Sequence, residues 1–138
     1  MMTTEDIEKM LWMQLKELVE LDVIPIRGGV YYERDLGNIS EDITVKAITV
    51  SGFGNRQRAD VSINVFVDDI RKNDNVYVTD KRRLDELSRC VLGYIKKIDI
   101  KSEPTGTVSV TQHTFEETSL HQHYVNFLLR FNLFDCQQ

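Results

Sequence analysis

The sequence contains few of the residues that mark secreted, membrane-bound or disordered proteins. Its 138 residues include 2 cysteines, 2 prolines and 7 glycines. Cys90 and Cys136 have no CxxC or paired spacing, which indicates free thiols and not a disulfide framework. No apolar run approaches the roughly 20 residues that a membrane-spanning helix requires, and the first residues are acidic where a signal peptide is basic. We therefore expect a protein made in the cytoplasm, with no membrane partner.

Positive charge is also scarce. The chain has 22 acidic and 17 basic side chains, for a net charge of -5. Binding to nucleic-acid phosphates depends on clustered Lys and Arg, so we expect no sequence-specific nucleic-acid partner. The same balance suits a protein that lets DNA pass without holding it. The length and the 41% apolar content predict a single globular domain over residues 1–138.

Hydrophobic periodicity predicts two helices and about five main strands. Apolar residues recur every three or four positions in two stretches, each preceded by a capping residue. The predicted helices run from Thr3 or Thr4 to about Leu21, and from Thr79 or Asp80 to Ile98. Alternation of apolar and polar residues predicts strands at Val30–Tyr32, Ile43–Val50, Ala59–Val67, Thr107–Thr114 and His121–Phe134, with a short segment at Val76–Val78.

Residues 33–42, 51–58 and 69–75 are polar and are predicted to be loops. This order of elements indicates an α+β fold: a single antiparallel sheet of about five strands with both helices packed on one face. Val65 and Leu129 are expected in the dry layer between sheet and helices. A charge at either position, as in Val65→Asp or Leu129→Asp, is expected to prevent soluble folding.

His121-Gln122-His123 comes nearest to a metal site. On a strand, positions i and i+2 share a face, so both rings can reach one ion. The third ligand has to come from a neighbouring strand, from His113, Glu116 or Glu117. Such a site would make the protein a small metal-dependent enzyme. The alternative places both histidines at the solvated start of an edge strand, and because the ligand pattern is incomplete we expect no metal or cofactor.

No arrangement typical of acid–base or nucleophilic catalysis accompanies these histidines. Glu41-Asp42 and Asp68-Asp69 are adjacent carboxylate pairs at strand ends, where we expect solvated loops and not converging catalytic groups. A nucleophile elbow, an activated cysteine and a phosphate-binding loop are all lacking. We expect no catalytic residues.

The loop at residues 51–58 is the candidate interaction site. Phe53 stands between two glycines and is followed by Arg56 and Arg58, so it can project from a hairpin tip with the arginines as a polar rim. The alternative is a Phe53 folded back over the sheet edge. In the first case, Phe53→Ala weakens assembly and leaves the melting temperature nearly unchanged. A further possibility is a monomeric binding module that uses the open sheet face.

With these elements in this order, the chain resembles the tail terminator (tail completion) and neck proteins of long-tailed bacteriophages and prophages. The resemblance covers nearly the whole chain and lies in the N-terminal helix, Ile24-Pro25-Ile26, the strand pair around Val45 and Val65, the helix Leu84–Ile98 and the strand Tyr124–Phe131. It implies a non-enzymatic virion protein of the tail or neck, assembled in the host cytoplasm. Its implied partners are other copies of itself, in rings that are often hexameric, and other neck or tail proteins. An acidic lumen in such a ring would repel DNA phosphates.

Overall fold

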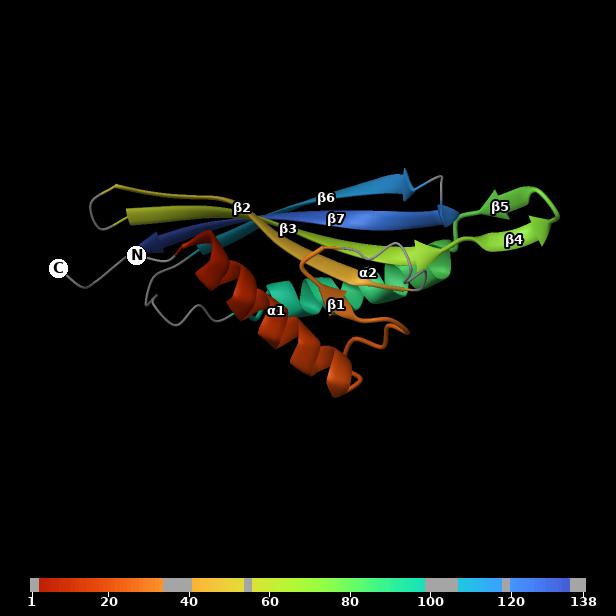
Figure 1. Ribbon diagram of the computed structural model, residues 1–138, viewed down its shortest axis with the longest axis horizontal. Coiled ribbons are helices and arrows are strands. Elements are labelled where there is room, and N and C mark those ends of the chain that lie inside the picture. Colours follow the sequence, from red (N-terminus) through yellow and green to blue (C-terminus); the bar gives the residue numbers. More distant parts are fainter. Residues whose placement is uncertain (1–2, 34–40, 54–55, 99–106, 118–119, 135–138) are drawn as a thin grey trace.

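The fold contains two helices and seven strands in the part of the chain that the computed structural model describes, residues 3–33, 41–53, 56–98, 107–117 and 120–134. In chain order they are α1 (Thr4–Glu20), β1 (Val30–Tyr31), β2 (Ile43–Phe53), β3 (Arg56–Asp68), β4 (Ile70–Asn73), β5 (Val76–Val78), α2 (Lys81–Ile95), β6 (Thr107–Glu117) and β7 (Gln122–Phe134). Five strands form one sheet in the order β1-β2-β3-β7-β6, and β4 and β5 form a separate hairpin (Figure 1). The α+β prediction is confirmed.

Local sequence explains where the helices begin. Thr3 and Asp6 form a capping box, in which each side chain accepts a hydrogen bond from the other residue's backbone N–H. Asp80 caps α2 by accepting a hydrogen bond from the N–H of Arg83. Ile7, Leu11 and Leu15 then form the buried face of α1.

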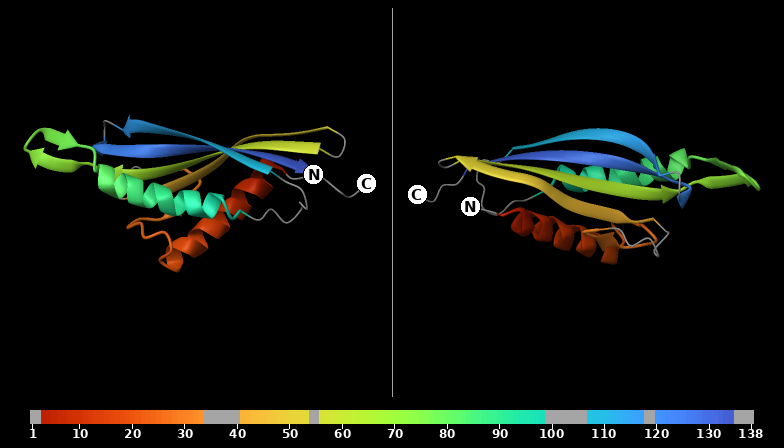
Figure 2. Two further views of the ribbon diagram at one scale, coloured as in Figure 1. Left: turned by 180° about the vertical axis from the view of Figure 1, so that it is seen from behind. Right: turned by 45° about the horizontal axis from the view of Figure 1, so that its top comes forward.

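The core lies between the helices and one face of the sheet. Both helices are on the same side of the five strands in Figures 1 and 2. Val65 of β3 pairs with Val125 of β7, and alternate residues are buried with them, from Val61 to Val67 on β3 and from Val125 to Phe131 on β7. Val65 and Leu129 are fully buried in this cluster, as predicted.

Three features of the sheet differ from the prediction. β1 runs parallel to β2, with Val30 opposite Ile43, so the sheet is mixed and not wholly antiparallel. The long polar segment after Tyr31 gives the chain enough length to return and start β2 in the same direction. β2 and β3 also extend into the predicted 51–58 loop, and β7 lies inside the sheet, not at its edge.

The predicted 69–75 loop is also wrong, because it contains β4. Ile70 pairs with Val78 and Arg71 with Tyr77. Asp74 and Asn75 form the turn between the strands, and such residues are typical of tight turns. The polar composition of this segment concealed a hairpin.

Candidate functional site

The five-stranded sheet has two edges, and they differ in how their backbone groups are covered. At the first edge, β1 pairs with β2 only at Ile43 and Thr44. The rest of β2 is protected by side chains and by an irregularity. The Glu8 carboxylate accepts a hydrogen bond from the N–H of Ala47 at 2.9 Å, and the register shifts between Ala47 and Thr49. Covers and bulges of this kind block the pairing of another strand.

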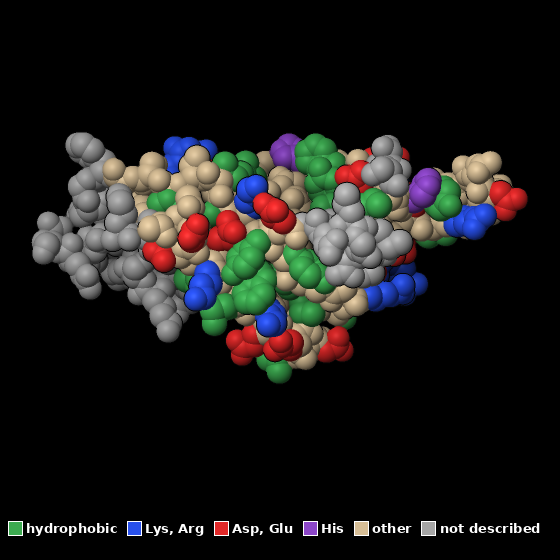
Figure 3. Space-filling view, viewed as in Figure 1, with side chains coloured by type: hydrophobic (Ala, Val, Ile, Leu, Met, Phe, Trp, Pro, Cys, Tyr) green, Lys and Arg blue, Asp and Glu red, His purple; other side chains and the backbone are tan. Residues whose placement is uncertain are grey.

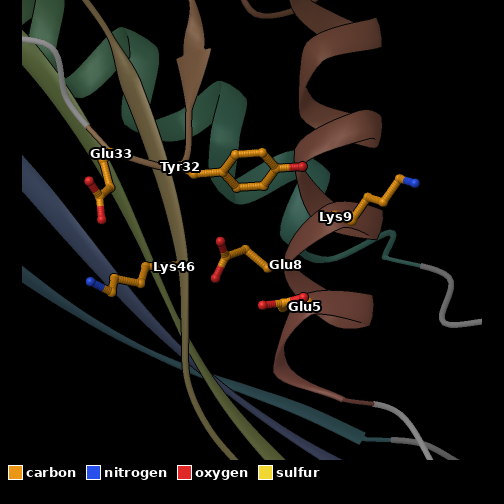
Figure 4. A pocket seen from close by; sticks show the side chains of 6 residues that line it. All are labelled: Glu5, Glu8, Lys9, Tyr32, Glu33 and Lys46. Atoms are coloured by element: carbon orange, nitrogen blue, oxygen red, sulfur yellow. The ribbon is translucent and has the colours of Figure 1, made fainter.

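Figure 4 shows how this cover is built. Glu8 points from α1 toward β2, in an open hollow that is also lined by Tyr32 and Lys46. One turn further along α1, Trp12 Nε1 donates a hydrogen bond to the carbonyl of Val30 in β1, the outermost strand, at 2.8 Å. Its ring stacks on Tyr32 with centroids 5.3 Å apart. The first edge is therefore occupied by groups from the chain itself.

The second edge, β6, has no such cover among the described residues. β6 pairs only with β7, over all eleven of its residues. Every side chain from Ser109 to Glu116 is exposed, and the stretch from Thr107 to Phe115 contains no charged residue and no proline. A long edge strand of this composition is a template for pairing with another chain. β6 is thus the open edge of the molecule.

Beside β6 lies an open groove of about 400 Å³ against α2. Leu84 of α2 and Val125 of β7 form its apolar base, and Gln112 and Thr114 of β6 line its other side. Ser88 also lines the groove, and its hydroxyl oxygen is buried with no hydrogen-bond partner among the described residues. Buried polar groups are normally satisfied, so this hydroxyl is an exception within α2.

The β4–β5 hairpin extends beyond the end of the sheet as a projecting arm (Figures 1 and 2). Every side chain of β4 is exposed. Ile70 is 47% and Val76 is 44% exposed, although both are apolar. In the space-filling view of Figure 3, the end of the arm carries charged side chains of both signs.

The root of the arm is fixed to β7 by hydrogen bonds around His123. Nδ1 lies 2.6 Å from Asp69 Oδ1, and Nε2 lies 3.1 Å from Thr79 Oγ1. Asp69 precedes β4 and Thr79 follows β5, so one imidazole connects both ends of the hairpin. His121 adds a stacking contact with Tyr77, with ring centroids 3.7 Å apart. We call Asp69, Thr79 and His123 the arm clasp.

The arm clasp bears on the alternative in which His121 and His123 bind one metal ion. His121 lies in the turn before β7, with a φ of 51°, so it does not share a strand face with His123. The described residues contain no cluster of three or more His, Cys, Asp or Glu that could hold a metal. His113, Glu116 and Glu117 lie on β6, and both ring nitrogens of His123 already have protein partners.

The predicted solvated acids are wrong in both pairs. Glu41 and Asp42 are buried, with 2% and 0% exposure, and the Asp69 side chain is 4% exposed within the arm clasp. The Arg83 guanidinium holds Glu41 through two hydrogen bonds, of 2.6 Å and 2.8 Å. This bidentate ion pair joins α2 to the chain that leads into β2.

The ion pair also sets the charge state of both groups. Burial is the largest single effect and would raise the pKa of Glu41, but the hydrogen bonds and positive charges of Arg83 and Arg27 together outweigh it, so the pKa lies below its ordinary value of 4.5. The hydrogen bonds to Glu41 raise the pKa of Arg83. Both groups are therefore ionised at neutral pH, as a structural ion pair requires.

The structure only partly describes the predicted interaction loop. The side chains of Phe53 and Arg56, and residues 54 and 55, lie outside the described residues. Arg58 is exposed on β3, where its guanidinium lies 3.6 Å from Asp60. The docking role of Phe53, Arg56 and Arg58 therefore stays a prediction.

The open edge and the arm were missed in the sequence analysis, although signals for both were present. The predicted strand Thr107–Thr114 contains no charged residue, which is a feature of an unprotected edge. The Asp74-Asn75 pair between Ile70 and Val76 is a turn signal. Neither signal shows where in the sheet a strand lies.

Comparison with known proteins adds no further identification. No protein-family model and no curated protein matches this chain. Among the described residues, no helix combines the length and apolar character needed to cross a membrane. The functional argument therefore rests on the geometry of the chain and on the resemblance in the order of its elements.

Proposed function

We propose that this chain is a non-enzymatic structural protein of the phage or prophage tail terminator or head–tail neck type, whose copies associate into a ring. Its place is the tail or neck of the virion, after assembly in the host cytoplasm. Its partners are further copies of the chain and other neck or tail proteins.

The observation that carries the proposal is the open edge strand β6. Within the described part of the chain, the eleven residues of β6 pair on one side only, and the other edge of the sheet is covered by Glu8 and Trp12. Proteins that work as monomers normally protect both edges of a sheet, because an open edge leads to uncontrolled association. A single unprotected edge is what a subunit with a defined neighbour needs.

A second support is the projecting arm. Isolated two-stranded hairpins are marginally stable in water, and this one extends away from the body with Ile70 and Val76 exposed. The arm clasp nevertheless holds its root in place. A fixed arm with an unburied apolar surface is suited to contact a neighbouring subunit.

Native mass spectrometry and negative-stain imaging of the purified full chain test this proposal. We expect a closed oligomer of defined copy number, visible as rings. Phe53→Ala in the same measurements tests the predicted loop contact, and it should lower the oligomer fraction without changing the melting temperature. A chain that stays monomeric up to its solubility limit contradicts the self-association on which the proposal depends.

A further inference from the structure

We propose that the β4–β5 arm of one copy docks into the groove between α2 and β6 of the next copy. This inference rests on the proposed self-association and names the two surfaces that meet. We call these surfaces the arm face (Ile70, Val76 and Val78) and the α2–β6 groove.

The arm has one apolar face. Ile70 lies opposite Val78, and Val76 precedes Val78 by two residues on the same strand. Residues directly opposite or two apart project to one side of a hairpin. Tyr77 and Arg71, which form the next pair, are on the other side, where Tyr77 stacks on His121. The arm therefore presents aliphatic side chains in one direction while its other face is held by its own chain.

The groove provides the complementary chemistry. It has an apolar base of Leu84 and Val125, and Val110 next to it on β6 is 37% exposed. The open backbone edge of β6 can pair with a strand of the incoming hairpin, as in recognition by β-strand addition.

The exposed arm face favours this pairing over two groove surfaces meeting each other. The charges do not decide it, because Arg71 pairs with Asp74 on the arm at 3.2 Å and the groove is lined by both Lys81 and Asp85. Two copies joined β6 to β6 would leave both arm faces exposed to water. The occupant we assign to the groove is therefore the arm of a second copy.

The geometry of this contact produces a ring or a chain of copies. The arm and the groove are different surfaces of one molecule, so each copy uses its arm on one neighbour and its groove on another. Such head-to-tail contacts close into rings when the rotation between copies allows it. A contact of one surface with itself would stop at two copies.

A mixing experiment tests the inference, using native mass spectrometry of the full chain. Val76→Lys disables the arm and leaves the groove, and Val110→Lys disables the groove and leaves the arm. We expect each variant alone to be monomeric, with association weakened by about tenfold or more. Mixed in equal amounts, they should form a dimer of twice the 16.1 kDa chain mass and nothing larger, because each pair retains one intact arm–groove contact.

Controls separate misfolding from loss of the contact. Each variant must keep the circular dichroism spectrum and melting temperature of the wild type. Ile48→Lys, an exposed aliphatic residue on the covered β2 edge, should associate like the wild type.

The outcomes distinguish this inference from the proposed function. If the wild type forms oligomers and Val76→Lys forms them equally well, the arm contact is wrong and self-association stands. If Val110→Lys abolishes association and the mixture does not form the dimer, β6 is used in another way and the inference is also wrong. A wild type that never associates overturns both.

Discussion

The carboxylate of Glu8 on α1 accepts a hydrogen bond from the backbone N–H of Ala47 on β2, 2.9 Å away and 39 residues apart in the chain. This hydrogen bond satisfies the Ala47 N–H, which would otherwise be free to pair with another strand. It makes the two edges of the sheet unequal, since β6 has no equivalent among the described residues. In the proposed function, this difference between the edges leaves β6 as the place where a neighbouring copy binds.

Removing the Glu8 cover should expose the β2 edge. Glu8→Ala leaves the Ala47 N–H without its partner, at a cost of about 1–3 kcal/mol in the free energy of unfolding, and it should produce additional, irregular association. Thermal unfolding combined with light scattering measures both effects. Glu5→Ala is the matched control, because Glu5 lies one turn away on the same helix and lines the same hollow. Equal behaviour of the two variants would argue against the cover.

The buried ion pair between Arg83 and Glu41 should be essential for stability. Arg83→Met removes both short guanidinium hydrogen bonds from Glu41, whose side chain is 3% exposed, and leaves it the longer contact with the exposed Arg27 at 3.9 Å. Removing one partner of a buried pair costs about 3–5 kcal/mol. Urea unfolding followed by circular dichroism measures this loss. Arg82→Met, which changes the exposed neighbour on α2, should lie within about 0.5 kcal/mol of the wild type. A small effect at Arg83 would show that the ion pair is not a structural link.

The lowered pKa of Glu41 predicts instability in acid. A carboxylate whose pKa is lower in the folded than in the unfolded state stabilises the fold fully above its unfolded pKa, near the ordinary value of 4.5. That stabilisation is lost as the pH falls through the folded pKa. The urea midpoint of the wild type should therefore drop steeply below about pH 4.5. Glu41→Gln should reduce this slope, and an unchanged slope in that variant would assign the acid sensitivity to other groups.

The arm clasp should control the order of the hairpin. His123→Ala removes both bonds to Asp69 and Thr79 and leaves a buried carboxylate unpaired, at a cost of about 1–3 kcal/mol. Hydrogen exchange should then become faster over residues 70–78 than over β3. His113→Ala is the control, because it removes an exposed imidazole from β6. Unchanged exchange in the hairpin of the His123 variant would mean that other contacts hold the arm.

Much of the fold could be predicted because periodicity reports burial directly. The alternation around Val65 and the three-to-four spacing around Leu87 identify the buried side of a strand and of a helix, and both residues are fully buried. The strand at Val30 was predicted, but its parallel direction was missed, because two residues contain no signal for strand direction. β4 was missed because its exposed residues Arg71 and Lys72 are as polar as a loop.

The candidate site was harder to predict because it depends on contacts between distant segments. The sequence around Glu41 predicts a solvated acid, because its ion-pair partner Arg83 lies 42 residues later in the chain. In the sequence, His123 has the spacing of a metal ligand, but in the structure its two ring nitrogens contact Asp69 and Thr79. Adjacency in the sequence gives no information about these partners, and neither does it show which strand lies at an open edge.

Sedimentation velocity of the wild type, Val110→Lys and Ile48→Lys tests the central claim most directly. Both variants replace an exposed aliphatic residue by lysine. Val110→Lys does so on β6, at the open edge, and Ile48→Lys does so on β2, at the covered edge. The account predicts that the wild type and Ile48→Lys sediment as the same oligomer and that Val110→Lys sediments as a folded monomer. An oligomer that survives Val110→Lys unchanged would contradict the claim that copies of this chain meet at β6.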